Sequence, residues 1–528
     1  MGIRFFLLNF IFASLFGALI FNLYQLQVEE SGYYFDKAQA RSEYQEELQL
    51  RRGGIFFTDK NNNDIPLSLN RDYPVIFASP KDIVNPEETA RKVSQILDLD
   101  FNKLKSELDN PKSMFKLLAE KAEPEEIEAF KDLDIEGLHI SYKQHRYYPF
   151  DSLASSLVGF VGVNDKYSDP VGLYGLELFY NDELRKGEDL YLTVDRNVQS
   201  ESEKVLEKLM STFNAVSGSI IVQEPSTGKI LAMVNMPDFN PNNYSDYSIS
   251  SFINPSIQHV YEPGSVFKPL TMAVGLDLEV LTPNTSFFDT GSVTLNGRTI
   301  RNWDKKAHGQ ITMTNVIERS VNTGAVFAVQ RIGKENFLRY LRRFGFDQKT
   351  GINLPNEVSG SLNNLERKGF RDIDLATASF GQGTSVTSIQ MISSYSVIAN
   401  GGLLMKPILN KDESPQVIRR VISKEASEKV INMMESAVRK AQVAYIPQYL
   451  VAGKTGTAQI PDFEYGGYSE EYIHTFVGFA PASEPKFTIL IKLDKPNVDL
   501  AGMTVVPAFK NLAQFLLNYY NIAPDDIN

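Results

Sequence analysis

The apolar N-terminus constrains this chain more than any other segment. From Phe5 to Leu26 the sequence runs for 22 residues without a charged side chain, and no later apolar stretch reaches 18. As an α-helix this run would be about 33 Å long, which matches the hydrocarbon core of a bilayer. The sequence therefore predicts a single transmembrane helix, within an anchor segment of residues 1–28.

The charges on either side of this run predict its orientation. Arg4 and the amino terminus precede it, whereas Glu29 and Glu30 follow it. The positive-inside tendency then leaves residues 29–528 outside the cytoplasm, in a periplasm or in the extracellular space. A cleaved signal peptide is the competing interpretation, but the run exceeds the usual length and no A-x-A-like cleavage site follows it.

Composition excludes several classes of function. The 528 residues carry 53 basic and 65 acidic side chains, and the resulting net charge of −12 disfavours broad binding to nucleic acids. The chain has no cysteine, so a disulfide, a thiolate nucleophile and a cysteine-ligated metal are excluded. Any nucleophile in this protein must therefore be an oxygen or a nitrogen.

Hydrophobic patterns divide the remainder near residue 200. Residues 29–200 mix helical and extended patterns, and the spacing between Pro86 and Leu138, as in the segment 115–121, predicts two or three surface helices. From residue 201 to residue 528 the patterns predict a second domain: a hairpin at 219–235, helices at 266–276, 314–332, 334–344, 388–400 and 507–520, and a buried strand at 487–493. Strands at both ends of a helical middle predict an α+β layered fold.

Two patterns imitate known sites but fail. Gly453-Lys454-Thr455 resembles the end of a phosphate-binding loop, but Gln448 stands where that loop requires glycine. The polar turn at 59–64 resembles a calcium loop without its central glycine, and we interpret it as a hairpin tip. With five histidines and neither H-E-x-x-H nor G-x-S-x-G, a zinc protease or a nucleophile-elbow hydrolase has little support.

Three short motifs remain as candidates for chemistry. Ser265 and Lys268 form S-x-x-K after the helix-starting pair Pro263-Gly264, so both side chains share one helix face. Alone, this spacing is more often a capping serine beside a solvated lysine. Ser320-Val321-Asn322 and Lys454-Thr455-Gly456-Thr457 follow it in order. Together, in an exported chain, the three motifs resemble the serine acyl-transferases of the penicillin-binding and β-lactamase group.

The N-terminal half narrows this resemblance to the class B penicillin-binding proteins. Five segments of this chain are similar to the N-terminal pedestal motifs of that family: 52–55, 146–149, 159–162, 172–177 and 192–195. The resemblance implies a single N-terminal transmembrane helix, an elongated mixed α/β pedestal with a dimerisation-like domain over residues 29–200, and a β-lactamase-like transpeptidase domain over residues 201–528. The transpeptidase domain would be an antiparallel sheet flanked by helices. No cofactor and no metal are implied.

The resemblance also implies roles for the first two motifs. Ser265 would be the nucleophile that attacks the D-alanyl-D-alanine bond of a peptidoglycan stem peptide, and β-lactams would acylate the same serine. Lys268 would be the base, since burial and the nearby Lys454 both favour its neutral form. Ser320 would pass the proton to the leaving nitrogen. Asn322 would hold the substrate amide and orient Lys268.

The third motif would bind the terminal carboxylate of the substrate. Lys454 would act there together with Thr455 and Thr457, while Gly456 would let the substrate lie close to the strand. The backbone N–H groups of Ser265 and Thr457 would form the oxyanion hole, which is typically worth about 3 to 4 kcal/mol per donor.

Other residues bear on the subclass and on the cleft. Glu262 and Asn322 are more similar to division-type members of the family than to elongation-type ones. The glycine-rich segment 381–384 is either a support loop of the cleft or a turn between helices. Four aromatic residues could line a substrate groove or pack in the core: Trp303, Phe463, Tyr465 and Tyr468.

Partners follow from the family resemblance. Nothing in the chain resembles a glycosyltransferase domain, so we expect a polytopic glycosyltransferase of the shape and division class, with other division proteins, as partners. The small residues Ser14, Gly17 and Ala18 would allow close helix packing in the membrane. Alternatives remain: an elongation-type transpeptidase, a D,D-carboxypeptidase or β-lactamase with the same site, and a non-catalytic division scaffold.

Overall fold

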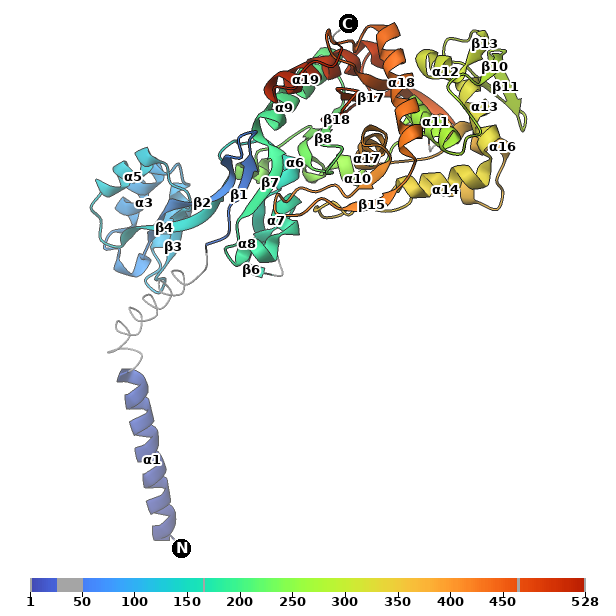
Figure 1. The fold of residues 1–528 in the computed structure, drawn as a ribbon. Helices are drawn as coiled ribbons and strands as arrows, with labels where there is room; N and C mark the ends of the chain where they lie inside the picture. Colours follow the sequence, from blue (N-terminus) through green and yellow to red (C-terminus); the bar gives the residue numbers. More distant parts are fainter. Residues whose placement is uncertain (1, 26–50, 165–166, 463–465, 527–528) are drawn as a thin grey trace.

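The computed structural model describes residues 2–25, 51–164, 167–462 and 466–526 (Figure 1). The first helix, α1 (Gly2–Tyr24), contains a stretch, Phe5–Tyr24, that is long and apolar enough to cross a membrane. None of that stretch is buried inside the protein. Within the described ranges it is the only such helix, which agrees with the predicted single anchor.

A five-stranded sheet forms the frame of the pedestal. Its path runs β3-β2-β1-β7, and β4 pairs with β2 off this path. Its strands are β1 (Ile55–Thr58), β2 (Asp64–Ala78), β3 (Lys116–Ala119), β4 (Leu138–Tyr147) and β7 (Leu190–Asp195). The long strand β2 pairs with β1 near its start and with β3 near its end, so one strand joins both ends of the pedestal.

The outer end of the pedestal is a small head with its own core. Three short helices cover the strands there, α3 (Pro86–Ile96), α4 (Phe101–Leu108) and α5 (Pro124–Lys131). The predicted two or three surface helices between Pro86 and Leu138 are confirmed. The segment 115–121, the example given for their spacing, is not one of them, because residues 116–119 form β3. Pairing with β2 buries Leu118, and Phe115 packs against Phe77 with ring centroids 5.2 Å apart, so sheet contacts override the local helical spacing.

The inner end of the pedestal is held by a buried carboxylate. Glu177 lies in α7 (Gly175–Phe179) and has no solvent exposure. It accepts hydrogen bonds from Arg52 Nε at 2.8 Å, from Arg146 Nε at 2.7 Å and from Ser68 Oγ at 2.9 Å. Three sequence-distant pedestal motifs therefore meet at one carboxylate. The elements around it are α6 (Ser155–Val158), β5 (Val161–Asn164), β6 (Tyr167–Gly172) and α8 (Asn181–Arg185).

A second five-stranded sheet forms the centre of the larger body. Its order is β16-β17-β18-β8-β9, and every neighbouring pair is antiparallel. Its strands are β8 (Ser217–Gln223), β9 (Ile230–Met236), β16 (Ala452–Pro461), β17 (Tyr468–Ala480) and β18 (Phe487–Asp494). The predicted hairpin and the predicted buried strand are confirmed.

Helices cover both faces of this sheet. On one face lie α9 (Arg196–Phe213) and α19 (Val505–Tyr519), packed on Ile489, Ile491 and Leu493 of β18. On the other lie α11 (Lys268–Asp277), α17 (Ser388–Ala399) and α18 (Lys424–Ala441). This arrangement is the predicted α+β fold of an antiparallel sheet flanked by helices. The predicted domain boundary at 200 falls inside α9, and the division at that residue stays a prediction.

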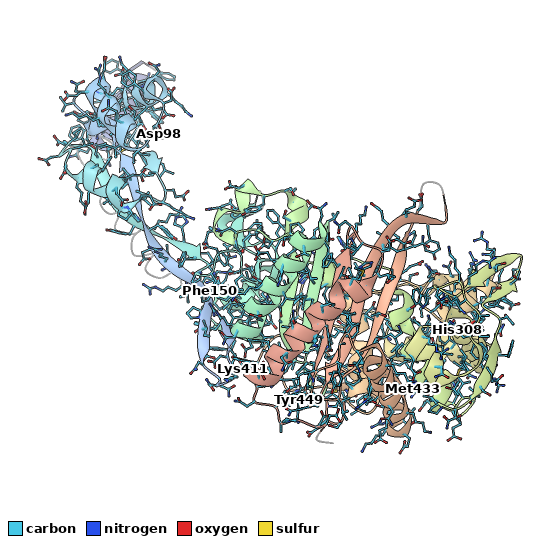
Figure 2. The ribbon with its side chains drawn as sticks, turned by 90° about the horizontal axis from the view of Figure 1, so that it is seen from above. Asp98, Phe150, His308, Lys411, Met433 and Tyr449 are labelled. Atoms are coloured by element: carbon cyan, nitrogen blue, oxygen red, sulfur yellow. The ribbon has the colours of Figure 1, made fainter. Side chains whose placement is uncertain are left out.

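A lobe of short elements completes the body at the end far from the pedestal. Figure 2 places Asp98 in the head, Phe150 at the junction and His308 in this lobe. The lobe holds β10 (Ser286–Asp289), β11 (Ser292–Leu295), β12 (Arg298–Arg301), β13 (Gly309–Thr312), α12 (Met313–Arg319), α13 (Asn322–Ile332), α14 (Lys334–Phe344), α15 (Asn363–Glu366) and α16 (Asp372–Ala378). The remaining elements are η2 (Pro80–Asp82), η3 (Pro241–Asp246), η4 (Ile249–Phe252), α10 (Pro255–Gln258), η5 (Gly264–Phe267), β14 (Leu403–Met405), β15 (Val417–Arg420) and η6 (Ala501–Met503).

Removing the charge of Glu177 should destabilise the pedestal. Burial by itself would raise the pKa of Glu177, but the charges of Arg146 and Arg52 outweigh it and hold that pKa below its ordinary value. Glu177→Gln leaves both guanidinium groups buried without a counter-ion, which should cost roughly 3 to 5 kcal/mol of unfolding free energy. Urea denaturation followed by circular dichroism measures the change.

The pH dependence and an exposed control sharpen this test. Because its folded-state pKa is lowered, Glu177 stabilises the native chain above its ordinary pKa, and this contribution is lost as pH falls through the lowered value. Glu177→Gln should therefore flatten the acid limb of the stability curve. Glu87→Gln, which removes exposed ion pairs with Lys105 and Arg91, should change the curve far less, because solvent screens these pairs. Equal effects of both variants would contradict the role given to Glu177.

Candidate active site

Ser265 lies in the turn η5, directly before α11. Gly264 has a φ of +62°, a left-handed conformation that favours glycine, and its N–H donates to the carbonyl of Gly381 at 3.1 Å. The hydroxyl of Tyr395 donates to the carbonyl of Val266 at 2.7 Å. The main chain on both sides of Ser265 is thus fixed. The Ser265 hydroxyl is partly exposed and makes no hydrogen bond with any described residue.

Lys268 is the first residue of α11, and its side chain has no solvent exposure. Its Nζ donates to the carbonyl oxygen of Ser320 at 2.6 Å and to Oδ1 of Asn322 at 2.8 Å, and it lies 3.1 Å from the hydroxyl of Ser320. The first two predicted motifs therefore meet at this amine. The contact that S-x-x-K spacing suggests, between Lys268 and the Ser265 hydroxyl, is not made in the described structure.

Ser320 lies at a break between two helices. The predicted continuous helix over 314–332 was wrong, since α12 ends at Arg319 and α13 begins at Asn322. Ser320 has a φ of +56°, which ends α12, and its N–H donates to the carbonyl of Ile317. The break turns the carbonyl and the hydroxyl of Ser320 toward Lys268, which a residue inside a regular helix could not do with its carbonyl.

Asn322 is held from its other side by the lobe. Its Nδ2 donates to the carbonyl oxygen of Arg301 at 2.8 Å, which fixes the amide so that Oδ1 faces Lys268. Sequence reasoning did not find Arg301, because the contact uses its main chain and leaves no residue-type signal.

The third motif lies on the edge strand β16. A Cβ atom at Gly456 would meet the carbonyl oxygen of Pro263 at 2.9 Å, so only glycine lets this strand touch the Ser265 turn. Lys454 is 5% exposed, and its Nζ donates to the carbonyl of Thr455 at 3.1 Å. The hydroxyl of Thr457 accepts a hydrogen bond from the N–H of Ala501 at 3.3 Å.

Burial changes the protonation of both lysines. Burial is the main cause that lowers the pKa of Lys268 well below its ordinary value, and the charge of Lys454 lowers it further. Burial also lowers the pKa of Lys454 to about 7. A neutral Lys268 therefore faces a Lys454 that can still carry a positive charge near neutral pH.

The three motifs open onto one cleft of about 1050 Å³. Six predicted residues line it: Ser265, Ser320, Asn322, Lys454, Thr455 and Thr457. Lys268 and Gly456 are not among its lining residues: Lys268 donates to the lining residue Asn322, and Gly456 lies between the lining residues Thr455 and Thr457, against Pro263. The cleft also includes residues 499–502, which the sequence did not indicate because they lie in a loop without a motif.

The other residues singled out in the sequence divide into three outcomes. Gln382 and Gly383 line the cleft, and Gly383 N–H donates to Glu262 at 2.9 Å, as the support-loop interpretation predicts. Tyr468 and Trp303 also line the cleft. Phe463 and Tyr465 lie outside the described residues.

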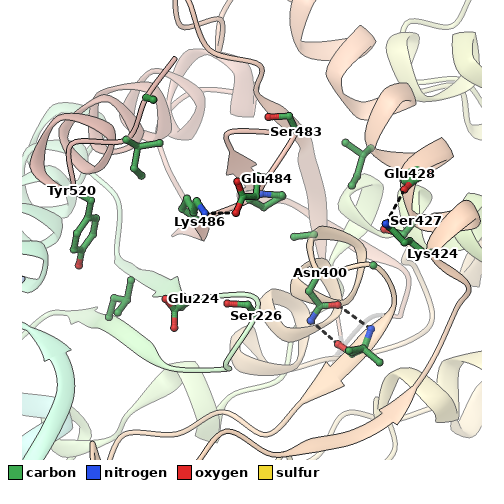
Figure 3. Close-up of a pocket in the computed structure, with 18 of the residues that line it drawn as sticks. Glu224, Ser226, Asn400, Lys424, Ser427, Glu428, Ser483, Glu484, Lys486 and Tyr520 are labelled. Carbon is green, nitrogen blue, oxygen red and sulfur yellow. Dashed lines mark hydrogen bonds and ion pairs between the residues drawn. The ribbon is translucent and has the colours of Figure 1, made fainter. Parts of the chain in front are cut away.

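A second cavity of about 930 Å³ shares no lining residue with this cleft (Figure 3). Its charged side chains pair locally, Lys424 with Glu428 at 3.7 Å and Lys486 with Glu484 at 2.5 Å. None of the predicted site residues lines it.

Two family models match the chain. The penicillin binding protein transpeptidase domain matches residues 218–514, which is more than half of the chain, and the penicillin-binding protein dimerisation domain matches residues 49–222. Their order is that of the predicted pedestal and transpeptidase domains.

Curated proteins and a solved structure are similar over most of the chain. Stage V sporulation protein D of Bacillus subtilis (strain 168) is 31% identical over 513 residues, which cover 88% of this chain and 78% of that protein. Peptidoglycan D,D-transpeptidase FtsI of Escherichia coli (strain K12) is 28% identical over 534 residues, which cover 95% of this chain and 89% of that protein. A peptidoglycan synthetase from Bifidobacterium adolescentis has the same fold, with a TM-score of 0.69 at 23% identity over 91% of this chain and 97% of that one. With both domains matched in this order, the chain belongs to the class B penicillin-binding proteins.

Proposed function

We propose that this chain is a peptidoglycan D,D-transpeptidase, a serine acyl-transferase that cross-links stem peptides in septal cell-wall synthesis. One observation carries the proposal: the buried amine of Lys268 lies 2.8 Å from Asn322 and 3.1 Å from the Ser320 hydroxyl, behind the cleft that Ser265 lines. A buried amine with a lowered pKa, next to alcohols in a cleft, is the arrangement that activates a hydroxyl without histidine.

In the first half-reaction Ser265 attacks the carbonyl between the two terminal D-alanines. A bond forms between Oγ and the carbonyl carbon, the C–N bond breaks and D-alanine leaves. Neutral Lys268 accepts the hydroxyl proton, and Ser320 passes a proton to the leaving nitrogen. Catalytic hydrogen bonds commonly tighten in the substrate complex, so a free Ser265 hydroxyl is compatible with this step.

The edge strand β16 supplies the binding groups. Lys454 with Thr455 and Thr457 binds the terminal carboxylate of the substrate, and Gly456 keeps the strand close to the nucleophile. The N–H groups of Ser265 and Thr457 stabilise the oxyanion. β-Lactams, whose strained amide resembles the same bond, acylate Ser265 in the same way.

In the second half-reaction an amine of a neighbouring stem attacks the acyl carbon: a C–N bond forms, the ester bond to Ser265 Oγ breaks, and a proton from the amine returns to Oγ. A carboxylate free to activate water would favour hydrolysis. Glu262 lines the cleft, but one of its oxygens accepts from the N–H of Gly383 and the other from the hydroxyl of Tyr468, both at 2.9 Å. This engagement favours transfer to an amine over hydrolysis. Product analysis on stem peptides tests it, since D-alanine release without cross-linked dimers would favour hydrolysis.

The septal role rests on the relatives and on two residues. The Escherichia coli relative is named FtsI, a peptidoglycan D,D-transpeptidase, and the Bacillus subtilis relative is named for sporulation. Glu262 and Asn322 are those of division-type members. We place the N-terminus in the cytoplasm and the pedestal, residues 29–200, outside it, where it supports the transpeptidase domain. A polytopic glycosyltransferase of the division machinery supplies the glycan chains.

Replacing Ser265 tests the nucleophile. The full-length chain incubated with benzylpenicillin should gain one adduct on the peptide that contains Ser265, and Ser265→Ala should abolish it, because no other cleft hydroxyl shares a turn with Lys268. Mass spectrometry of the digested protein measures the adduct. Ser211→Ala, an exposed serine on α9, is the control and should keep it. An adduct on the Ser265→Ala chain at the native rate would overturn the catalytic assignment.

The two lysines should give acylation a bell-shaped pH profile. The rate rises on the acid side as Lys268 loses its proton, and it falls as pH rises through about 7, where Lys454 loses the charge that holds the carboxylate. Lys454→Arg should remove the alkaline fall, since a guanidinium stays charged there. Stopped-flow acylation by a β-lactam between acid and alkaline pH measures both limbs. An unchanged alkaline limb in Lys454→Arg would contradict the role of Lys454.

The anchor should contact the glycosyltransferase through its small residues. Replacing residues 4–27 with an unrelated apolar helix should abolish co-purification with the polymerase, and Gly17→Leu should weaken it, because a larger side chain separates closely packed helices. Phe16→Leu on the other face of the helix is the matched control. Unchanged co-purification of the replaced anchor would count against the helix contact.

A further inference from the structure

One wall of the cleft carries basic side chains that the proposed reaction does not use. Arg298 and Arg301 on β12 and Arg319 at the end of α12 line the same cleft as Ser265. We call these three residues the arginine wall. All three are exposed, and within the described ranges their side chains form no ion pair and no hydrogen bond. A chain with a net charge of −12 thus presents three uncompensated positive charges beside its nucleophile.

The main chain under the arginine wall is fixed. The carbonyl of Arg301 accepts from Asn322 Nδ2 at 2.8 Å, which ties β12 to the second catalytic motif. The carbonyl of Arg319 accepts from the indole N–H of Trp303 at 3.0 Å. The Trp303 ring is 60% exposed and lines the cleft. The guanidinium groups are therefore free to bind, while the strand and helix that carry them are held beside the reaction centre.

The remaining charges of the cleft do not neutralise this wall. Arg367 and Arg371 also line the cleft, but they share the carboxylate of Asp374, at 2.7 and 3.2 Å. Glu318 is bound by Lys440 at 2.7 Å, and Glu262 is engaged by Gly383 and Tyr468. Lys305 also lines the cleft without an ion pair among the described residues, and Asp499 adds an exposed carboxylate to the same lining. The arginine wall therefore holds three of the four exposed basic side chains that line the cleft without a partner.

We propose that the arginine wall binds a carboxylate of the stem peptide other than the one at its reactive end, and so selects acidic stem peptides. This inference rests on the proposed function. In that function β16 holds the terminal carboxylate, whereas the arginine wall lies on β12 and α12, so a second carboxylate would come from further along the peptide. The planar guanidinium group pairs with a carboxylate through two parallel hydrogen bonds, which suits arginine for this task.

The test compares the native chain with a triple variant, each acting on two donor peptides. The full-length chain in detergent, native or with Arg298→Gln, Arg301→Gln and Arg319→Gln together, is given synthetic stem peptides with internal carboxylates either free or amidated. With the free-acid peptide, kcat/KM of the variant should fall about tenfold, because KM rises while kcat stays unchanged. This size is expected for the loss of three partly solvated charge pairs. For the amidated peptide, native and variant should be equal.

Two control variants separate binding from charge and folding. Arg51→Gln, Arg91→Gln and Arg339→Gln together remove the same charge from exposed arginines outside the cleft and should leave KM unchanged. Arg298→Lys, Arg301→Lys and Arg319→Lys together keep the charge but cannot form the two parallel hydrogen bonds to a carboxylate. This variant should recover part of the loss in kcat/KM for the free-acid peptide. Trp303 is the only tryptophan of the chain and lines the cleft, so its emission should respond to the free-acid peptide at a lower concentration than to the amidated one.

The β-lactam reaction distinguishes failure of this inference from failure of the proposed function. Benzylpenicillin has one carboxylate, which stands for the terminal one, so it should acylate Ser265 equally in the native chain and the triple variant. If acylation is equal but the variant also treats both peptides as the native chain does, the arginine wall has no role. A native chain that forms no adduct would instead overturn the proposed function. An effect on the KM of the donor supports the inference, whereas an effect confined to the KM of the acceptor would overturn it.

Discussion

The burial of the Lys268 amine is the constraint on which the cleft depends. A lysine without solvent exposure holds its charge only at high cost, and the charge of Lys454 adds to that cost. Its contacts suit the neutral form, which has two N–H donors for the Ser320 carbonyl and the Asn322 amide, and a lone pair for the Ser320 hydroxyl. The helix break at Ser320 follows from this need, since a regular helix would keep that carbonyl for its own hydrogen bond.

The positions of the reacting groups are set by main-chain contacts rather than by their own side chains. Glycines allow these contacts: a Cβ at Gly456 would meet Pro263 at 2.9 Å, and one at Gly381 would meet the carbonyl oxygen of Gly264 at 2.4 Å. The Tyr395 hydroxyl holds the next carbonyl along, that of Val266. The oxyanion hole that we propose from backbone N–H groups would require such fixed main chain, because a small displacement of either donor weakens it.

The sequence indicates the residues to which we assign the reaction better than it indicates the contacts that position them. Ser265, Lys268, Asn322 and Lys454 are visible because their chemistry depends on residue type. The break at Ser320 is hidden, since the surrounding pattern is continuously helical and only the tertiary contact with Lys268 makes the break favourable. Residues 115–121 fail for the same reason, because pairing with β2 outweighs local spacing. The arginine wall has no motif, since it is assembled by the folding of β12 and α12 around one cleft.

The pedestal is joined to the catalytic body through folded structure. Its last strand, β7, runs directly into α9. Thr193 of β7 donates hydrogen bonds to the body, from its N–H to the carbonyl of Leu409 and from its hydroxyl to the carbonyl of Ile230. Asp195 caps α9 and also accepts from the hydroxyl of Tyr519, while Lys60 in the tip of the pedestal hairpin donates to the Tyr519 carbonyl at 2.8 Å. These contacts link the pedestal to α9 and α19, the two helices that cover the same face of the second sheet. A protein that binds and orients the pedestal therefore also orients the cleft, without touching the residues that carry out the reaction.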